Sequence, residues 1–469
     1  MRIFIAGGTG VIGWRSVQRL VRAGHTVTAI ARTPEKAELV RVLGADPVEV
    51  SLFDAAALAT AVAGHDVVVN LATHIPGLRQ AAFPGAWKEN DRIRTEGAAN
   101  LVDAALAAGA GRYIQESITF TYPDAADGWI DEDTAIDTGP ALAAVTAAEA
   151  AVARFTASGG TGVVLRFGMF CAPDATHTAD QVAAARRGVG AVVGDPDAYQ
   201  SMVHADDAAA AVVAALDAPA GTYNVVESDP GTKRQDAEAL CDAVGRRAKV
   251  LLPGKSAKLG GKATSPLSRS QRVSNRRFAE ATGWEPAFPS IRDGFASVVA
   301  AMPEPEPRPL LARLVRPAAV LLALTALGLG LWAILDPTGF YVSFPFGRGW
   351  VAADGPYNEH LIRDFGSLHL ALAVLYGAVA IWPERRWVRV AALAALVDGV
   401  PHLLYHALNL DPYGTADAVG TVVSLALNLT LPAVMILGTA SDADPAPAAP
   451  IADRRALATA AAAEGTPVA

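Results

Sequence analysis

Residues 1–13 read MRIFIAGGTGVIG, a short apolar stretch that runs directly into a turn with glycine at every third position from Gly7 to Gly13. The apolar stretch predicts a β-strand, and residues 12–23 predict the helix that follows it. In such a turn Gly7 permits the tight bend, Gly10 lets the backbone approach a diphosphate, and Gly13 lets helix and strand pack closely. The diphosphate would lie at the helix N-terminus, where free N–H groups and the helix dipole favour an anion. The turn therefore predicts a dinucleotide site, and a glycine-rich turn without a ligand is the alternative.

Short apolar runs alternate with alanine-rich helical stretches as far as about residue 300. This alternation predicts an α/β fold, a Rossmann-type doubly wound parallel sheet with helices on both faces and a small substrate subdomain. Six strands are expected, at 1–6, 25–31, 46–52, 66–72, 112–117 and 162–167.

The end of the second expected strand, Ala31-Arg32-Thr33, bears on the choice of dinucleotide. A site that prefers NAD usually has an acidic residue here, which hydrogen-bonds the ribose 2′-hydroxyl. This chain has Arg32 instead, and a guanidinium suits the 2′-phosphate of NADP. We therefore predict NADP in preference to NAD; the alternative is that Arg32 is a solvated surface residue.

Further motifs follow in order along the first 300 residues: SLFD at 51–54, NLAT at 70–73, TEGAANLVDAA at 95–105, LRFG at 165–168, MVHADDAAAAVVAAL at 202–216, GTYNVVE at 221–227 and QRVSNRRFAEATGWEP at 271–286. With the glycine-rich turn, this series resembles the extended or atypical short-chain dehydrogenase/reductases, the NAD-dependent epimerase/dehydratase family. The resemblance implies that Asp54 approaches the adenine and that residues 71–73 line the nicotinamide side. The predicted cofactor-binding residues are Gly7, Thr9, Gly10, Val11, Ile12, Gly13, Arg32, Asp54, Leu71, Ala72 and Thr73.

The proton-transfer residues of that family are missing. The family uses a Tyr-x-x-x-Lys pair with an upstream Ser or Thr, but alignment on Glu149 places Ala141 and Val145 at the Tyr and Lys positions. Ser117 remains as the upstream hydroxyl, and it either hydrogen-bonds a substrate or is satisfied locally. Tyr122 is a second candidate catalytic residue, although a tyrosine needs a positioned partner to act as an acid.

Three functions remain open at this stage. The first is an oxidoreductase or isomerase in which NADP supplies the hydride and other groups position a small apolar or lipid-linked substrate. The second is a non-catalytic sensor of dinucleotide redox state, and the third is a scaffold for a membrane assembly. The stretch His204-x-Asp206-Asp207 matches a family segment that more often organises the domain than contacts substrate.

Composition narrows the class of protein. The 469 residues are 52% hydrophobic, with a mean hydropathy of +0.27, which is high for a cytosolic enzyme of this size, and the excess follows residue 310. The net charge is −8 without a block of basic residues, so a nucleic-acid partner is not expected. Cys171 and Cys241 lie far apart in the sequence, so neither a disulfide framework nor a metal site is predicted.

Four apolar segments, at 317–335, 363–382, 387–410 and 418–438, approach the ~20 residues that cross a bilayer as a helix. The first has no polar face, which argues against a buried soluble bundle. Arginines cluster before the first segment, between the second and third, and after the fourth. Because positive charge marks the cytoplasmic side, we expect a multi-pass protein of the cytoplasmic membrane with its N-terminal domain and C-terminus in the cytoplasm. The absence of a signal peptide at the N-terminus agrees with this orientation.

These patterns predict four regions. They are an NAD(P)-binding domain at 1–300, a Pro-rich linker at 301–312, an all-α transmembrane four-helix bundle at 313–439 and a disordered tail at 440–469. Residues 336–350 are aromatic and are expected to form an interfacial loop.

One face of the third apolar segment is polar, with Asp398, His402, Tyr405, His406 and Asn409 within a narrow arc. A metal, quinone or proton site is one interpretation of this face. A hydrogen-bond network that holds the helices together is the other.

Overall fold

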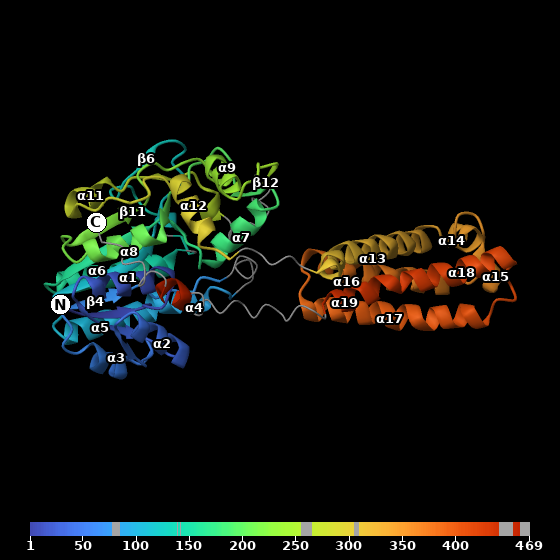
Figure 1. The fold of residues 1–469 in the computed structure, drawn as a ribbon, viewed down its shortest axis with the longest axis horizontal. Coiled ribbons are helices and arrows are strands. Elements are labelled where there is room, and N and C mark those ends of the chain that lie inside the picture. The colour runs from blue at the N-terminus through green and yellow to red at the C-terminus, as the bar shows by residue number, and fades with distance from the viewer. Residues whose placement is uncertain are drawn as a thin grey trace. The chain divides into compact units, whose positions relative to one another are not determined.

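The structure is a computed structural model that describes residues 1–76, 85–137, 139–140, 142–254, 265–303, 309–439 and 454–459. Its contacts divide the chain into two compact units, residues 1–303 with 449–469 and residues 304–448 (Figure 1).

A seven-stranded sheet in which every pair is parallel forms the centre of the first unit, in the order β11-β7-β5-β4-β1-β2-β3. The six predicted strands are all present, and β11 is a seventh that the sequence pattern did not identify. The bounds are β1 Arg2–Ala6, β2 Thr26–Ile30, β3 Asp46–Val48, β4 Val67–Asn70, β5 Arg112–Ile118, β7 Thr161–Phe167 and β11 Gly221–Val225. Strand order reverses beside β1, which pairs with β2 on one side and β4 on the other. Doubly wound sheets bind their ligands at such a reversal, beyond the carboxyl ends of the strands.

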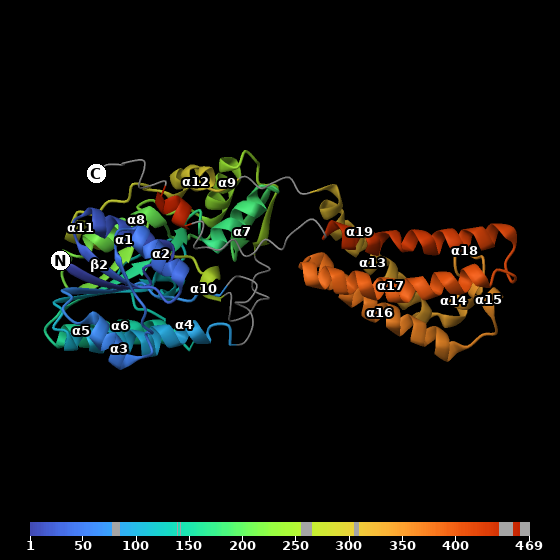
Figure 2. The ribbon, with the colours of Figure 1, turned by 60° about the horizontal axis from the view of Figure 1, so that its bottom comes forward.

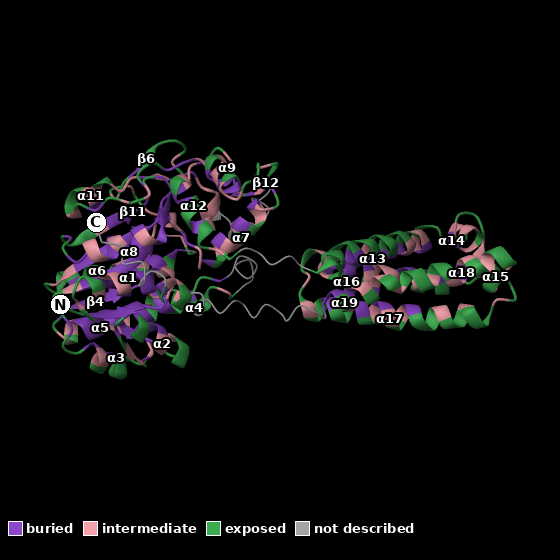
Figure 3. Ribbon diagram, in the orientation of Figure 1, coloured by how far each residue is buried: buried purple, intermediate pink, exposed green. Residues whose placement is uncertain are grey.

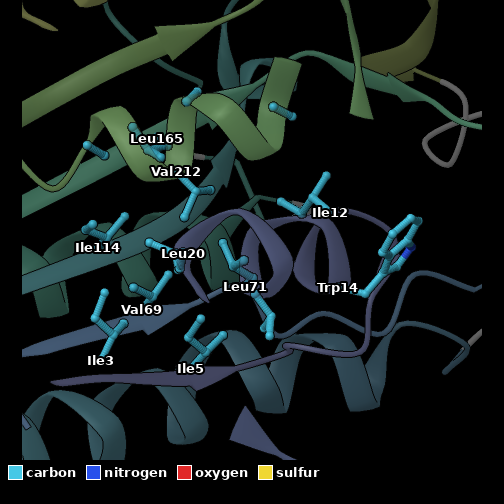
Figure 4. Packing of buried hydrophobic residues seen from close by; sticks show 14 of the residues in the cluster. Ile3, Ile5, Ile12, Trp14, Leu20, Val69, Leu71, Ile114, Leu165 and Val212 are labelled. Carbon is cyan, nitrogen blue, oxygen red and sulfur yellow. The ribbon is translucent and has the colours of Figure 1, made fainter. Parts of the chain in front are cut away.

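Helices cover both faces of this sheet (Figure 2). One face carries α1 Val11–Arg22, α2 Pro34–Val42 and α8 Ala205–Ala214, and the other carries α3 Ala55–Val62, α5 Ala98–Ala107 and α6 Ala143–Ala157. The strands read as near-continuous apolar runs because both of their faces are buried. Figure 4 shows Ile3 and Ile5 of β1 packing with Leu20 of α1 and Val69 of β4. This core fixes the start of α1 against the end of β1, which positions the glycine-rich turn.

A smaller subdomain is formed by segments that lie between and after the later strands of the sheet. It contains three two-stranded pairs, β10-β8, β12-β9 and β13-β6. Its strands are β6 Trp129–Ile130, β8 Met169–Cys171, β9 Val189–Val193, β10 Met202–His204, β12 Val250–Gly254 and β13 Arg272–Val273. Its helices are α7 Thr176–Ala185, α9 Lys233–Ala243, α10 Ser265–Ser268, α11 Arg276–Thr282 and α12 Ile291–Ala300, while α4 Lys88–Arg92 continues through a π-helical turn, Ile93–Gly97, into α5.

The second unit is helical. Its long elements are α13 Leu310–Leu335, α16 Glu359–Ile381, α17 Arg385–Leu408 and the consecutive α18 Thr415–Asn428 and α19 Thr430–Gly438. Among the described residues, four helical stretches, the last comprising α18 and α19, are by length and composition apolar enough to cross a membrane. The 336–350 region is not a loop, because α14 Pro337–Ser343 and the start of α15 Trp350–Asp354 are helical. The predicted linker also ends earlier than expected, since α13 begins at Leu310.

The long helices have exposed positions along their lengths (Figure 3), and large apolar residues occupy many of these positions. Leu324, Val374, Leu393 and Leu427, one from each span, are all at least half exposed. Inside the bundle α13 and α16 approach closely, because a Cβ on Gly330 would lie 2.9 Å from the carbonyl oxygen of Gly366. Small residues at a close helix contact and large apolar residues outside are typical of helices packed in lipid.

The chain enters and leaves the second unit at the same end of the bundle. A Cβ on Gly438, the last residue of α19, would lie 2.5 Å from the carbonyl oxygen of Leu311 in the first turn of α13. At this end the Arg316 guanidinium donates to the Ile381 carbonyl at 3.3 Å and that of Arg389 donates to the Thr439 carbonyl at 3.5 Å. The structure thus gathers arginines that lie far apart in the sequence at one end of the four helices.

The predicted tail at 440–469 is not entirely disordered. Residues 454–459 form a short helix that packs on α1 of the first unit, drawn in red beside that helix in Figures 1 and 2. Ala458 is buried in the same core cluster as Leu20, and the Gln18 amide donates to the Ala458 carbonyl at 3.2 Å. This helix could not be predicted from composition, because it packs on residues more than 400 positions away in the sequence.

Candidate active site

The glycine-rich turn has the geometry that its sequence predicts. Gly7 has φ of 81°, and the Gly10 amide donates to the Gly7 carbonyl at 2.9 Å to close the bend. A Cβ on Gly7 would lie 2.4 Å from the carbonyl carbon of Leu71, and one on Gly13 would lie 2.0 Å from the Gly7 oxygen. These two glycines are therefore required by the packing of the turn against β4 and α1.

Gly10 differs from these two glycines because the described residues leave room for a Cβ on it. Within 4 Å, a Cβ built on it would meet only the Gly7 carbonyl oxygen, at 3.2 Å. Gly10 is the N-cap of α1 and provides no side-chain cap, and the first turn of α1 contains no acidic residue. The positive end of the helix dipole at the start of α1 is therefore not neutralised by a capping side chain or an acidic residue of that turn, which fits a diphosphate group.

The other predicted cofactor residues lie around this turn at the carboxyl ends of the strands. Leu71 and Ala72 directly follow β4 and border Gly7, while Thr73 is the next, exposed residue. Arg32 is exposed two residues after the end of β2, and Asp54 is the N-cap of α3, where its carboxylate accepts from the Ala57 amide at 3.0 Å. The carboxylate of Asp54 is thus already used to cap a helix.

A second cation lies near Arg32. Lys36 is in the first turn of α2, where its amide donates to the Thr33 hydroxyl at 3.4 Å. Partial burial, followed by the positive charges of Arg32 and Arg454, lowers the pKa of Lys36. The Lys36 ammonium is therefore within electrostatic range of both guanidinium groups.

Ser117, the first candidate catalytic residue, is completely buried and hydrogen-bonded. Its hydroxyl donates to Glu149 Oε1 at 2.6 Å. Two nitrogens of Arg166 also contact this carboxylate, Nε at 2.9 Å and Nη2 at 2.7 Å, in a bidentate ion pair. The Ser117 proton is consequently held by a carboxylate and is not directed toward a substrate.

Tyr122, the second candidate, belongs to the same network. Arg166 Nη1 donates to its phenol oxygen at 2.9 Å, and that hydroxyl donates to Asn224 Oδ1 at 2.8 Å. Burial raises the pKa of Tyr122, with the neighbouring Arg166 opposing this. Both candidates thus hold the ends of β5, β7 and β11 together.

Sequence reasoning used Glu149 only as an alignment anchor and did not select Arg166. A usable signal was present, because an arginine inside the apolar strand GVVLRF and a glutamate inside an alanine-rich helix each need a partner when buried. Val145, at the family's lysine position, is buried and apolar, and Ala141, at the tyrosine position, lies outside the described residues.

The His204-x-Asp206-Asp207 stretch organises the subdomain. The Asp207 carboxylate accepts from the Ala287 amide at 2.8 Å and the Phe288 amide at 3.1 Å, and His204 accepts from the Asp206 amide at 3.3 Å. Burial lowers the pKa of His204 to about 4, so its ring is neutral at neutral pH.

The polar face of α17 forms mainly local contacts. His402 and His406 approach each other at 3.1 Å between their Nε2 atoms, and His406 lies 3.8 Å from the Asp354 carboxylate. The Asn409 amide donates to the Tyr405 carbonyl within the same helix. Throughout the described ranges, no group of three or more His, Cys, Asp or Glu side chains has an arrangement that could hold a metal ion.

A basic cluster, which the sequence does not show as one block, occurs in the subdomain. It forms because β9 and β12 pair in parallel and bring two arginine pairs together across about 60 residues of sequence. The depression between them is lined by Arg186, Arg187, Gly188, Gly245, Arg246, Arg247 and Lys249. The fold thus brings together basic residues that form no continuous block in the sequence.

Comparison with known proteins places this geometry in a family. The sequence model of the NAD dependent epimerase/dehydratase family matches residues 3–226. A Streptomyces protein named 3-diazoavenalumate denitrifying reductase is 35% identical over 304 residues, which are 63% of this chain and 99% of that protein. The human epimerase family protein SDR39U1 is 25% identical over 308 residues, 64% of this chain and 100% of that protein.

Solved structures show the same fold. The crystal structure of SDR39U1 (isoform 2) with NADPH has a TM-score of 0.54 at 24% identity and covers 64% of this chain and 99% of that one. The structure of MoeE5 in complex with UDP-glucose and NAD has a TM-score of 0.53 at 21% identity, over 64% of this chain and 98% of that one. The chain belongs, through its first unit, to the NAD-dependent epimerase/dehydratase family of short-chain dehydrogenase/reductase proteins.

Proposed function

We propose that the first unit binds a nicotinamide dinucleotide, NADP(H) in preference to NAD(H), and uses it to reduce or isomerise a small apolar or lipid-linked substrate. The observation that carries this proposal is the open side of Gly10 at the N-terminus of α1, where a Cβ would meet, among the described residues, just the Gly7 carbonyl oxygen within 4 Å. Family membership and the NADPH-bound and NAD-bound neighbours support the same ligand class. When bound, the nicotinamide supplies or accepts a hydride.

The preference for NADP rests on charge at the end of β2. Arg32 replaces the acidic residue that a ribose 2′-hydroxyl requires, and Lys36 adds a second cation beside it. A 2′-phosphate would therefore be attracted here, whereas a 2′-hydroxyl would find no carboxylate partner at the position of Arg32.

The chain's own residues favour chemistry that needs no tyrosine acid. Val145 replaces the lysine, and the hydroxyl protons of Ser117 and Tyr122 are donated to Glu149 and Asn224. The function that fits is hydride transfer to an electron-poor atom of the substrate, with the accompanying proton taken from water. The name of the Streptomyces relative describes reduction of a diazo compound with loss of nitrogen, which supports an electron-poor acceptor.

The second unit is proposed to hold this enzyme at a membrane. Four apolar helices with apolar outer faces support a multi-pass arrangement, and an enzyme at the bilayer surface suits an apolar substrate. The arginines at one end of the bundle support placing that end, and both connections to the first unit, in the cytoplasm.

The test is a turnover assay on the full-length protein in detergent micelles or lipid nanodiscs. Oxidation of NADPH is followed by the loss of reduced-nicotinamide absorbance, with diazo compounds, enones and quinones as acceptors. Turnover that Gly10→Ala abolishes supports the proposal. Saturable binding of NADPH without oxidation by any acceptor would favour the sensor instead, and no binding would contradict both.

A further inference from the structure

The helix at 454–459 lies beside the glycine-rich turn, although the chain reaches it only after the four apolar helices. Arg454 Nη1 donates to the Thr9 carbonyl at 2.8 Å, and its Nε donates to Asp174 Oδ2 at 2.8 Å. Thr9 is the middle residue of the Gly-Thr-Gly sequence on which the predicted diphosphate site depends. A residue from the end of the chain therefore contacts the cofactor turn directly.

Asp174 holds Arg454 in this contact. Its side chain is fully buried between β8 and α7, and it accepts from Trp14 Nε1 at 3.1 Å and Arg15 Nη1 at 2.9 Å as well as from Arg454. Burial opposes its ionisation, but the positive charges of Arg15 and Arg454 outweigh that effect and lower the pKa of Asp174. This buried carboxylate, which Arg454 shares with Arg15, holds the Arg454 guanidinium in one position beside the turn.

The contact with α2 brings the tail helix to the ribose side of the turn. Arg455 lies 3.6 Å from Glu38 of α2, and the charges of Arg32 and Arg454 both act on Lys36 at the start of that helix. Arg32, Lys36 and Arg454 form a cluster of three cations from three separate segments of the chain. We define these residues as the cation cluster.

We propose that Arg454 is a dinucleotide-binding residue, which the C-terminal segment contributes to the cation cluster so that a 2′-phosphate is bound by groups from both ends of the chain. This inference rests on the proposed NADP(H) function and extends the site beyond the family domain, since the family match ends at residue 226. Bound NADP(H) and the docked tail then stabilise each other, because the tail contributes a cation to the phosphate and the phosphate holds that cation in place.

Affinity for NADPH and for NADH, measured on the full-length protein in detergent, tests the proposal. Arg454→Gln is expected to weaken NADPH binding about tenfold, as for loss of one charge-assisted hydrogen bond, and to leave NADH binding within about twofold. Arg454→Lys, which keeps the charge, should recover most of the loss. Arg455→Gln is the matched control, because Arg455 is half exposed and pairs with the half-exposed Glu38 of α2.

A second readout follows docking of the tail in the unaltered chain. Trypsin cleaves after arginine, so release of the C-terminal peptide at Arg454 and Arg455 reports undocking of this helix. NADP⁺ should slow this cleavage several-fold, whereas NAD⁺ at equal saturation should have a smaller effect.

The outcomes separate this inference from the proposed function. If the unaltered protein binds neither NADPH nor NADH, the proposed function fails. If it binds NADPH and Arg454→Gln leaves that affinity unchanged or tighter, or weakens NADPH and NADH equally, only the assignment of Arg454 to the 2′-phosphate is overturned.

Discussion

The two sides of the candidate site differ in what they require from the sequence. On the dinucleotide side, Gly7, Gly10 and Gly13 form the turn before α1, and Gly10 has room on the side where a Cβ would lie. On the proton-transfer side, Val145 is apolar, and the hydroxyl of Ser117 is closed off by Glu149. A diphosphate is bound by backbone groups, whereas proton transfer needs a particular side chain with a free proton. The comparison shows that this chain keeps the machinery for holding a hydride donor without the family's acid.

The largest expected effect concerns the proton-transfer side of the candidate site. Replacing Glu149 by leucine leaves Arg166 buried without its carboxylate, which should destabilise the first unit by about 3–5 kcal/mol. Hydrogen exchange of the β5 and β7 amides measures this loss. The control is Glu280→Leu, which removes an exposed i,i+4 partner of Arg276 and should cost less than about 0.5 kcal/mol. Equal protection in both variants would show that the network does not hold the strand ends.

The next effect distinguishes a glycine required for packing from a glycine required for binding on the dinucleotide side. Gly13→Ala places a Cβ 2.0 Å from the Gly7 oxygen and should destabilise the first unit by about 2–3 kcal/mol. Gly10→Ala meets the same oxygen only at 3.2 Å, so it should cost less than about 1 kcal/mol. Unfolding of both variants, followed by hydrogen exchange of β1, measures the difference. A Gly10→Ala protein as unstable as Gly13→Ala would remove the distinction between packing and binding glycines.

Tyr122→Phe tests whether the Tyr122 hydroxyl on the proton-transfer side acts as an acid in turnover. The change leaves Arg166 and Asn224 each without one buried partner and should cost about 1–3 kcal/mol of stability. Turnover per folded molecule should stay within about threefold, because the lost proton was held by Asn224. Steady-state kinetics at a temperature where both proteins are folded measures this, and a hundredfold fall in kcat would identify Tyr122 as the acid.

The smallest effect concerns a buried acid in the subdomain that could replace the missing tyrosine. Burial raises the pKa of Asp236 from 3.8 to about 7, with Arg292 opposing this. The folded protein therefore keeps this proton between those two values while the unfolded chain releases it, so stability falls as the pH rises through this window.

Asp236→Asn has no proton to lose in this window. Its stability should exceed that of the unaltered protein at about pH 8, and the difference should vanish below about pH 4. Thermal unfolding across this range measures the difference. Its pH profile of kcat should match that of the unaltered protein; a profile that loses an inflection near pH 7 would make Asp236 a proton donor.

Most of the fold was predictable because it depends on local patterns. The strands of the sheet are continuous apolar runs separated by helical stretches, and the four apolar segments after residue 310 are long helices. The seventh strand β11 was missed as a strand because GTYNV mixes polar and apolar residues at the edge of the sheet.

The site was predictable on one side only. The glycine-rich turn is local, so its geometry follows from consecutive residues. The network of Ser117, Glu149, Arg166 and Tyr122 joins separate elements, and its hydrogen bonds depend on distances that no short stretch of sequence specifies. The contact between Arg454 and Thr9 is the extreme case, because the two residues are 445 positions apart in the sequence and all residues of the second unit lie between them.

The most direct test of the account is a titration of the full-length protein in detergent with NADPH, compared with Gly10→Ala. The account predicts saturable binding by the unaltered chain and at least tenfold weaker binding by the variant, while hydrogen exchange shows both first units folded. Absence of binding by the unaltered chain, or equal affinity in the folded variant, would contradict the claim that the amides at the start of α1 bind the diphosphate.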